Sequence, residues 1–287
     1  MMWFLLALLS VTALAAAELL QQRLLNKQSA VNERASGVLT FLFQALFVLP
    51  FVLLTPYGKE FFAVFQPTIF PQLLAVTSIA SVGMVFYLRS FKVKNISYSS
   101  IFGSFSVVVS TALGIMVFGE STDPMKFIGI LFILVAIVLV NYRNVHLEKN
   151  HFYSLLSGAL FGICFTLDKS ILQSVSTPVY MFWTFLGASL FGFLFHPKSV
   201  LTSLKGKGFE AYRLIIVSGL CYFAYNALTF TAYTIGGEVG KVDAINNTTV
   251  FWIILFEYFI LMHKVSIKKK LAAAILAYIG VALLGFF

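Results

Sequence analysis

The sequence predicts an all-α membrane protein with ten transmembrane helices, arranged as two inverted five-helix repeats. Hydrophobic residues make up 60% of the chain and charged residues 11%, with a mean hydropathy of +0.92, which excludes a soluble protein with a polar surface. The chain also contains ten apolar stretches of the length that crosses a bilayer. Finally, residues 69–142 and 213–286 carry the same pattern in the same register, 144 positions apart, so that Gly129 aligns with Ala273.

The predicted spans follow from the thickness of the hydrocarbon core, which is ~30 Å and needs about 20 apolar residues per helix. Membrane-spanning strands are not expected, because a barrel strand alternates in polarity over roughly ten residues and these stretches are continuously apolar. The predicted spans are residues 2–22, 36–55, 69–90, 97–118, 125–142, 152–172, 178–195, 212–235, 242–262 and 271–287. The two repeats are then expected to be residues 1–143 and 144–287, with no soluble domain between them.

The first apolar stretch resembles a signal peptide, because Ala15, Ala16 and Ala17 end it before a polar residue. It lacks the basic segment with which a signal peptide opens, and its removal would leave the first repeat one helix short. We therefore interpret it as the first span. Cys164 and Cys221 both fall inside spans, where a thiol behaves as a small hydrophobe, so no disulfide framework, metal cluster or cofactor is expected.

The placement of basic residues predicts the orientation, because Lys and Arg near span ends favour the cytoplasmic side. Of the 20 Lys and Arg residues, 16 follow the first, third, fifth, seventh and ninth spans, and the other four are Lys59, Lys126, Lys169 and Lys241. The sequence thus predicts a cell-membrane protein with both termini outside. Membrane orientation and contact with anionic lipid account for the net charge of +9, so the lipid bilayer is an expected partner and nucleic acid is not.

Each repeat has five spans, so the second repeat enters the membrane from the opposite side, as in many secondary transporters. The segment Phe118-Gly119-Glu120, followed by Gly129 and Ala136, resembles the EamA-type branch of the drug/metabolite transporter superfamily. The resemblance extends over all ten predicted spans and implies a transporter, with export as the expected direction. The second repeat departs from it by placing His263-Lys264 at the position of Gly119-Glu120. The resemblance also implies cytoplasmic termini, whereas the bias in basic residues favours the opposite, which we retain.

Polar residues inside spans predict the position of a substrate cavity, because such residues are costly in lipid and face the protein interior. In the eighth span the polar residues recur at intervals of three and four, which places them on one helix face. The candidates of the eighth and ninth spans are Tyr222, Tyr225, Asn226, Thr229, Tyr233, Asp243, Asn246, Asn247 and Trp252. The candidates of the third and fourth spans are Ser78, Ser81, Ser99 and Ser106.

These residues predict a pocket with an aromatic and amide half and a hydroxyl half, which suits an amphipathic small molecule such as an amino acid. The alternative is that the same side chains only join helices through hydrogen bonds, each worth ~0.6 kcal/mol. For the serines of the fourth span both interpretations stay open. The bulk of three tyrosines on one face favours a pocket for the eighth span.

Acidic residues within spans are further candidates. Glu257 lies among apolar residues of the ninth span, and its protonation and release would couple transport to a proton gradient; alternatively it accepts a hydrogen bond from a tyrosine. Glu18 is expected to reach water at its helix end. Asp168 is expected to point away from the neighbouring Lys169. Lys169 is expected near the cavity mouth, where it would hold a carboxylate or extend to the interface.

The sequence contains no G-x-S-x-G turn, H-E-x-x-H pair, phosphate loop or dinucleotide fingerprint, so an enzyme is not expected. The predicted function is secondary transport of a small organic metabolite, an amino acid or related amphipathic solute or a drug, by alternating access. One alternative is a flippase for a lipid-linked substrate, which needs a lateral opening wide enough for an acyl chain. The other is a non-transporting membrane scaffold, which predicts a packed, dry centre. The chain is compatible with a monomer or a homodimer.

Overall fold

The computed structural model describes residues 2–26, 31–92, 102–141, 149–253 and 267–286, and these residues are helical or form turns, without a strand. The helices of the first half are α1 Met2–Asn26, α2 Glu33–Leu54, α3 Phe70–Ser90, α5 Phe105–Phe118 and α6 Pro124–Asn141, with the short helices η1 Pro56–Glu60 and η2 Ala63–Phe65 between α2 and α3. Those of the second half are α7 Lys149–Leu172, α8 Thr177–Phe195, α9 Pro197–Leu204, α10 Phe209–Thr234, α11 Val239–Asn246 and α13 Ile267–Phe286.

The prediction of an all-α membrane protein is confirmed for the described residues. Six of their helices, α1, α2, α3, α7, α8 and α10, are long and apolar enough to cross a membrane, and residues 105–118, 124–139 and 275–284 form shorter apolar helices. The count of ten spans stays a prediction, because parts of the predicted fourth and ninth spans lie outside the described residues. The sequence analysis did not predict α9, an eight-residue helix that begins at Pro197.

Local sequence signals explain where several helices begin and end. The Asn32 side chain caps α2 by accepting a hydrogen bond from the Ala35 amide at 2.8 Å. Asp123 does the same for α6 through the Met125 amide at 2.8 Å, and Pro124 is the first residue of that helix. At the end of α5, Gly119 adopts a φ of 62°, a conformation that glycine enters without steric cost.

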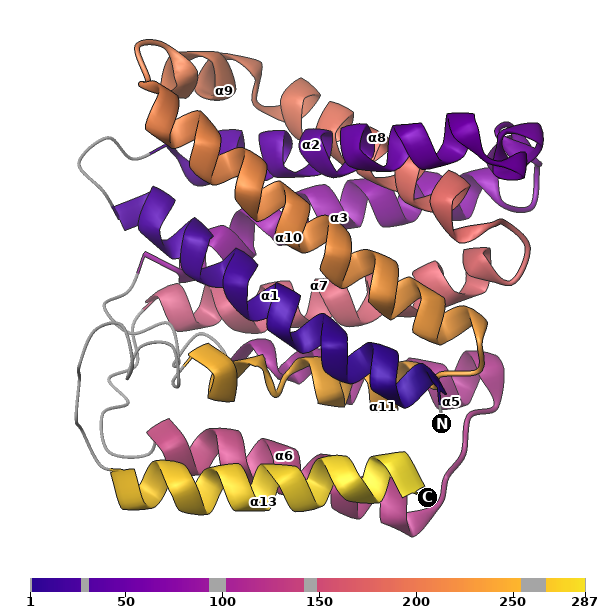
Figure 1. Ribbon diagram of the computed structural model, residues 1–287, viewed down its shortest axis with the longest axis vertical. Coiled ribbons are helices and arrows are strands. Elements are labelled where there is room, and N and C mark those ends of the chain that lie inside the picture. Colours follow the sequence, from indigo (N-terminus) through magenta and orange to yellow (C-terminus); the bar gives the residue numbers. More distant parts are fainter. Residues whose placement is uncertain (1, 27–30, 93–101, 142–148, 254–266, 287) are drawn as a thin grey trace.

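The helices of the two halves pack against each other in a reciprocal pattern (Figure 1). The first long helix of each half packs on the third of the other half, which makes the pairs α1 with α10 and α7 with α3. The second, fourth and fifth helices pair with their counterparts, as α2 with α8, α5 with α11 and α6 with α13. Exchange of the halves leaves this pattern unchanged, and α6 and α13 run in opposite directions, which is the arrangement that inverted repeats predict.

The pair α6 and α13 is joined by small residues. A Cβ atom added to Gly280 would lie 2.7 Å from the carbonyl oxygen of Gly129, so the two backbones are in direct contact. Ala136, Ala273 and Ala277 are buried along the same contact. Small side chains permit this approach, as they do in many membrane helix pairs.

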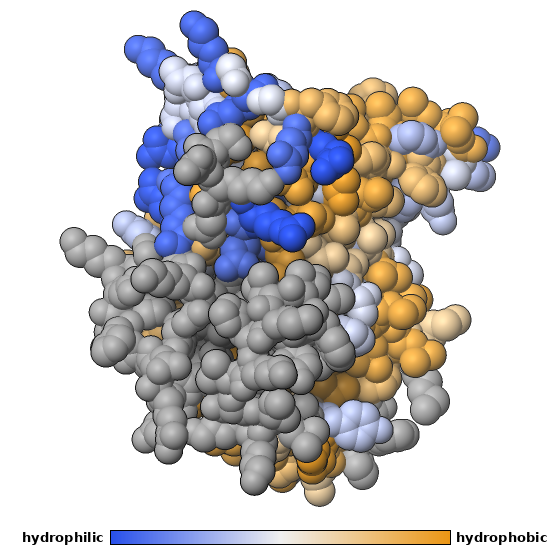
Figure 2. Space-filling view, turned by 60° about the vertical axis from the view of Figure 1, so that its left-hand side comes forward, coloured by the Kyte–Doolittle hydropathy of each residue, from blue (hydrophilic) through white to orange (hydrophobic). Residues whose placement is uncertain are grey.

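The two ends of the bundle differ in polarity. Both chain termini lie at one end, while α9 lies at the other (Figure 1). Hydrophilic residues gather at the end that carries α9, and hydrophobic residues cover the side that runs away from it (Figure 2). A hydrophobic side between a hydrophilic end and the opposite end is the surface expected of a protein whose helices contact lipid.

Candidate functional site

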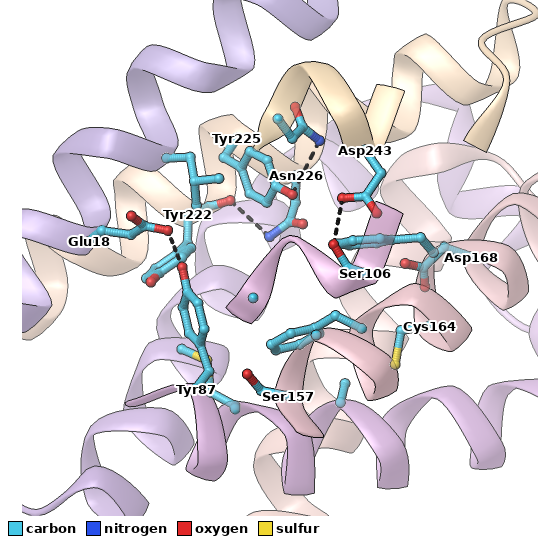
Figure 3. Close-up of a pocket in the computed structure, with 18 of the residues that line it drawn as sticks. Glu18, Tyr87, Ser106, Ser157, Cys164, Asp168, Tyr222, Tyr225, Asn226 and Asp243 are labelled. Carbon is cyan, nitrogen blue, oxygen red and sulfur yellow. Dashed lines mark hydrogen bonds between the residues drawn. The ribbon is translucent and has the colours of Figure 1, made fainter. Parts of the chain in front are cut away.

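A cavity of about 160 Å³ lies between the two halves, where α1, α2, α3 and α5 meet α7, α8, α10 and α11 (Figure 3). Its volume is close to that of cavities that hold one benzene molecule. Its polar lining residues are Glu18, Gln44, Tyr87, Ser106, Ser157, Asp168, Thr184, Tyr222, Tyr225, Asn226, Asp243, Asn246, Asn247 and Thr249. Aromatic rings form much of the remaining wall, namely Phe41, Phe91, Phe161, Phe165, Phe185 and Phe230.

Asp243 joins α11 to α5 at one corner of the cavity. Its carboxylate accepts hydrogen bonds from the Ser110 hydroxyl at 2.8 Å and from the Ser106 hydroxyl at 3.1 Å. The Asn247 amide, one turn further along the chain, donates to the same carboxylate at 2.9 Å. All three donors are neutral, so this corner carries an acidic group without a cationic partner among the described residues.

Asn246 connects α11 to two further helices, α1 and α10. Its side-chain oxygen accepts a hydrogen bond from Ser10 of α1 at 2.8 Å, and its amide nitrogen donates to the Tyr225 hydroxyl of α10 at 3.3 Å. Thr229 accepts from the same nitrogen at 3.4 Å. Asn226 donates to Gln44 of α2 at 2.8 Å, so α10 is also tied to the first half.

Two further carboxylates face the cavity. Glu18 of α1 accepts a hydrogen bond from the Tyr87 hydroxyl of α3, and Asp168 of α7 accepts one from the Tyr180 hydroxyl of α8. Figure 3 places Glu18 and Asp168 on opposite sides of the cavity. The sequence analysis expected Glu18 to reach water, but the residue is only 6% exposed. The signal that identifies both residues is a carboxylate inside an apolar span, which is a functional candidate by default.

The structure brings together seven of the residues that the sequence predicts for the site. Tyr222, Tyr225, Asn226, Ser106, Asp243, Asn246 and Asn247 all line the cavity. Thr229 and Tyr233 are buried on the same helix but are not in the wall. Among the described residues, the hydroxyl groups of Tyr222 and Tyr233 have no hydrogen-bond partner.

Three predicted residues lie elsewhere. Ser78 donates to the Leu74 carbonyl within α3 at 2.8 Å, and Ser81 lies against Gly192 of α8. Trp252 is 40% exposed and forms no part of the wall. The face of α3 that meets the cavity instead carries Val76, Ala80, Met84 and Tyr87, which recur at helical spacing. Ser99 and Glu257 lie outside the described residues, so both stay predictions.

An ion-pair network ties the halves together at the end of the bundle that carries the termini. Glu120, which follows α5, accepts from Lys169 of α7 at 2.9 Å and from Lys126 of α6 at 3.3 Å. Glu238, which precedes α11, accepts from Lys126 at 2.6 Å and from Lys241 at 3.0 Å. Lys169 was predicted to hold a substrate carboxylate or to extend to the interface, and the structure pairs it with Glu120 instead.

The carboxylate of Glu238 is held in its ionised form by this network. Burial acts to raise the pKa of Glu238, but hydrogen bonds from Lys126 and Lys241 outweigh burial and lower the pKa below its usual value. At the other end of the bundle, Glu33 of α2 pairs with Arg89 at 2.8 Å and with Lys92 at 2.5 Å. Ion pairs therefore hold helices together on both sides of the cavity.

Fold and site together define a helical membrane protein made of two equivalent halves around a central cavity. The chain matches the sequence model of the EamA-like transporter family over residues 1–142 and 149–286, once in each half. It therefore belongs to the EamA-like transporter family, as the residues around Phe118-Gly119-Glu120 predict.

Comparison with curated protein sequences found no match. Among solved structures, one described only as "Crystal structure of protein" is similar, with a TM-score of 0.74 and 14% sequence identity. The alignment covers 98% of this chain and 94% of that one. At this identity the similarity shows the fold alone, and it extends over both halves.

Proposed function

We propose that the chain is a secondary transporter that moves a small organic solute across the cell membrane by alternating access. The solute would be an amino acid or a related amphipathic metabolite or drug, and the family resemblance favours export. The observation that supports this proposal is the cavity, because its wall combines polar and aromatic side chains from both halves. A site at the interface of two repeats changes its exposure when one half moves against the other.

The ion pairs at the two ends suggest how such a movement is controlled. To open the end that carries the termini, α5 and α6 of the first half must separate from α7 and α11 of the second. This separation breaks the ion pair of Glu120 with Lys169. It also breaks the hydrogen bond that the Val239 backbone amide donates to Glu120 at 2.6 Å. Opening at the other end leaves these contacts intact. The network is thus suited to hold the end that carries the termini closed while the end that carries α9 opens.

The cavity also weighs against the two alternatives. A scaffold needs no hollow centre, whereas this protein has a cavity between its halves. The buried Tyr222 hydroxyl in the cavity wall has no ordinary hydrogen bond to a described residue, so it is available to a ligand. A lipid-linked substrate would need far more room than about 160 Å³ in this conformation. A solute with one ring, or with a similar number of heavy atoms, fits the available volume best.

We predict that a small solute raises the melting temperature of the detergent-purified protein, because a ligand that binds only the folded state stabilises it. The screen would contain amino acids, nucleosides, nucleotide sugars and cationic drugs. Tyr225→Ala and Asn246→Ala should each weaken the binding of a hit by about tenfold, since both residues line the cavity and share a hydrogen bond. The same solute should then exchange across proteoliposomes in a counterflow assay.

Ser78→Ala is the matched control, because Ser78 bonds only within its own helix and is absent from the cavity wall. It should leave binding unchanged. If no solute in a broad panel shifts the melting temperature or exchanges across proteoliposomes, the transporter proposal fails and the scaffold alternative gains support.

We further propose that both termini face outside, as the bias in basic residues predicts. An alkaline phosphatase fused after Phe287 should be active in a bacterial host, since that enzyme folds only outside the cytoplasm. A green fluorescent protein fused at the same position should be dark, since it fluoresces when it stays inside. The reverse pair of results would place the termini in the cytoplasm and show that the positive-inside bias does not decide the orientation of this chain.

A further inference from the structure

The cavity contains three acidic side chains and, among the described residues, no basic one. Glu18, Asp168 and Asp243 line it and are 6%, 5% and 2% exposed. None of the described Lys, Arg or His residues contributes to its wall. The carboxylic acids of the wall are therefore not balanced by any described basic side chain in the wall.

The hydrogen-bond partners of these carboxylates are neutral. Tyr87 donates to Glu18, Tyr180 donates to Asp168, and hydroxyl and amide groups donate to Asp243. Two buried acidic residues outside the cavity, Glu33 and Glu120, differ from these because each pairs with two basic residues. Removing an ionised carboxylate from water is costly unless it takes up a proton or a positive charge accompanies it, and a bound cation supplies that charge. No described residue of the cavity wall supplies a positive charge that would balance these three carboxylates.

The remaining wall suits a positively charged organic group. Stacked rings border the cavity, including Phe41 with Phe185 at 6.1 Å and Phe185 with Phe230 at 6.3 Å between ring centroids. Aromatic faces attract cations that lie within about 6 Å of the ring centre. The described carboxylates do not assemble into a group of three or more ligands able to hold a metal ion. The aromatic wall and the dispersed carboxylates therefore favour an organic cation over a metal ion as the ligand.

Glu18 is the best placed of the three to contact such a ligand. Asp243 already accepts hydrogen bonds from three side chains, whereas the described contacts of Glu18 comprise a single one, from Tyr87. Tyr222 lies near Glu18 and Tyr87 in the cavity wall, is 5% exposed, and its hydroxyl makes no hydrogen bond of ordinary length with a described residue (Figure 3). A buried hydroxyl without a partner indicates a place where a ligand completes the hydrogen bonding.

We propose that the cavity binds an organic monocation, an amine or a quaternary ammonium on an apolar body of about one ring, with its charge against Glu18. This inference rests on the proposed transport function and specifies the substrate class of the same site. The ammonium group would lie between the Glu18 carboxylate and the rings of Tyr87 and Tyr222. The apolar body would lie against the phenylalanine rings.

Four solutes with the same phenyl group and different charges test the proposal. They are phenethylamine (cationic), phenylalanine (zwitterionic), 2-phenylethanol (neutral) and 3-phenylpropanoate (anionic). Their affinities for the purified protein are measured by thermal shift and calorimetry. Phenethylamine should bind about tenfold more tightly than 2-phenylethanol, and 3-phenylpropanoate should be the weakest of the four.

Glu18→Gln keeps the size of the side chain and removes its charge. It should bring the affinity for phenethylamine down to that for 2-phenylethanol while it leaves the affinity for the alcohol unchanged. Glu60→Gln is the matched control, since Glu60 is exposed and is absent from the cavity wall, and it should change neither affinity. Asp168→Asn, on the opposite side of the cavity, should have a smaller effect than Glu18→Gln.

The outcomes separate this inference from the transport proposal. If the alcohol or the anion binds as well as the amine, the cavity is a ligand site but the preference for a cation is wrong. If Glu18→Gln keeps the full preference for phenethylamine, the position of the charge is wrong. If neither these solutes nor the wider panel binds or exchanges, the transport proposal itself fails. The selectivity of the unmodified protein decides the charge preference even where a variant does not fold.

Discussion

Replacement of Lys126 by Met is expected to lower the free energy of unfolding by up to about 3–5 kcal/mol, because it removes the buried lysine that Glu120 and Glu238 share and leaves each carboxylate with a single positive partner. The Lys126 side chain has no exposed surface and donates to Glu238 at 2.6 Å and to Glu120 at 3.3 Å. Methionine occupies a similar volume, so the loss comes from charge and hydrogen bonding and only a little from packing. The effect should appear as a clear decrease in the melting temperature of the detergent-purified protein.

Lys59→Met is the matched control for this experiment. Lys59 lies on the short helix η1 and is exposed, and the chemical change is identical. An exposed charge contributes little to stability, so the melting temperature should stay close to that of the unmodified protein. Equal shifts in melting temperature for the two substitutions would show that the ion pairs of Lys126 do not add to the stability of the protein.

A second substitution identifies the source of the loss. If the loss of the contact between Lys126 and Glu238 is responsible, the pair Lys126→Met and Glu238→Gln should be less destabilising than the sum of the two single changes. Glu120 keeps its contact with Lys169 in this background, so a complete recovery is not expected. Additive effects would contradict a direct interaction between Lys126 and Glu238.

The sequence was sufficient to predict the positions of the long described helices, because continuous apolar runs of about 20 residues have few alternatives in a membrane protein. The reciprocal packing of the halves also follows from the repeat, since equivalent helices make equivalent contacts. Helix α9 was missed for the opposite reason. It has eight residues between two predicted spans, and its sequence is neither long nor continuously apolar. Patterns of hydrophobicity carry little information about such short interfacial helices.

For the site, the success of the prediction depended on how polar each helix is. In α10 the spacing of Tyr222, Tyr225 and Asn226 identifies one face, and the structure places this face against the cavity. Helix α3 offers no such guide, because an apolar helix has no evident inner face. Its serines turned out to bond within their own helix or to lie against α8, while Tyr87 meets the cavity.

The alternative interpretation of polar residues, as connections between helices, also applies to part of this protein. Gln21 of α1 donates to Thr40 of α2 at 2.8 Å and to Ser218 of α10 at 2.9 Å, and none of the three lines the cavity. Such groups satisfy one another fully. The cavity residues differ from them in that the wall retains uncompensated carboxylates and a hydroxyl without a described partner. Polarity alone therefore does not separate a ligand site from a helix contact, whereas the balance of charges does.

Gly158→Ala is expected to destabilise the protein by about 1–3 kcal/mol, because the added methyl group has no room. Gly158 of α7 faces the residues that lead into α5, and a Cβ atom there would lie 2.5 Å from the carbonyl oxygen of Gly103 and 3.2 Å from the Ser106 amide. Backbone atoms cannot rotate away as a flexible side chain does, so the two segments must separate. The melting temperature of the purified protein measures the loss.

Gly83→Ala is the matched control for Gly158→Ala, because it adds the same methyl group where there is room for it. Gly83 is also a buried helical glycine against α7, but its Cβ atom would lie 3.5 Å from the Cβ atom of Leu160, which is an ordinary contact. Gly83→Ala should be neutral or stabilise by up to about 1 kcal/mol, because alanine favours the helix. Gly158→Ala should also weaken ligand binding, since Gly158, Gly103 and Ser106 all line the cavity. A protein that tolerates both changes equally would contradict the close approach of these segments and, with it, the shape of the cavity that they enclose.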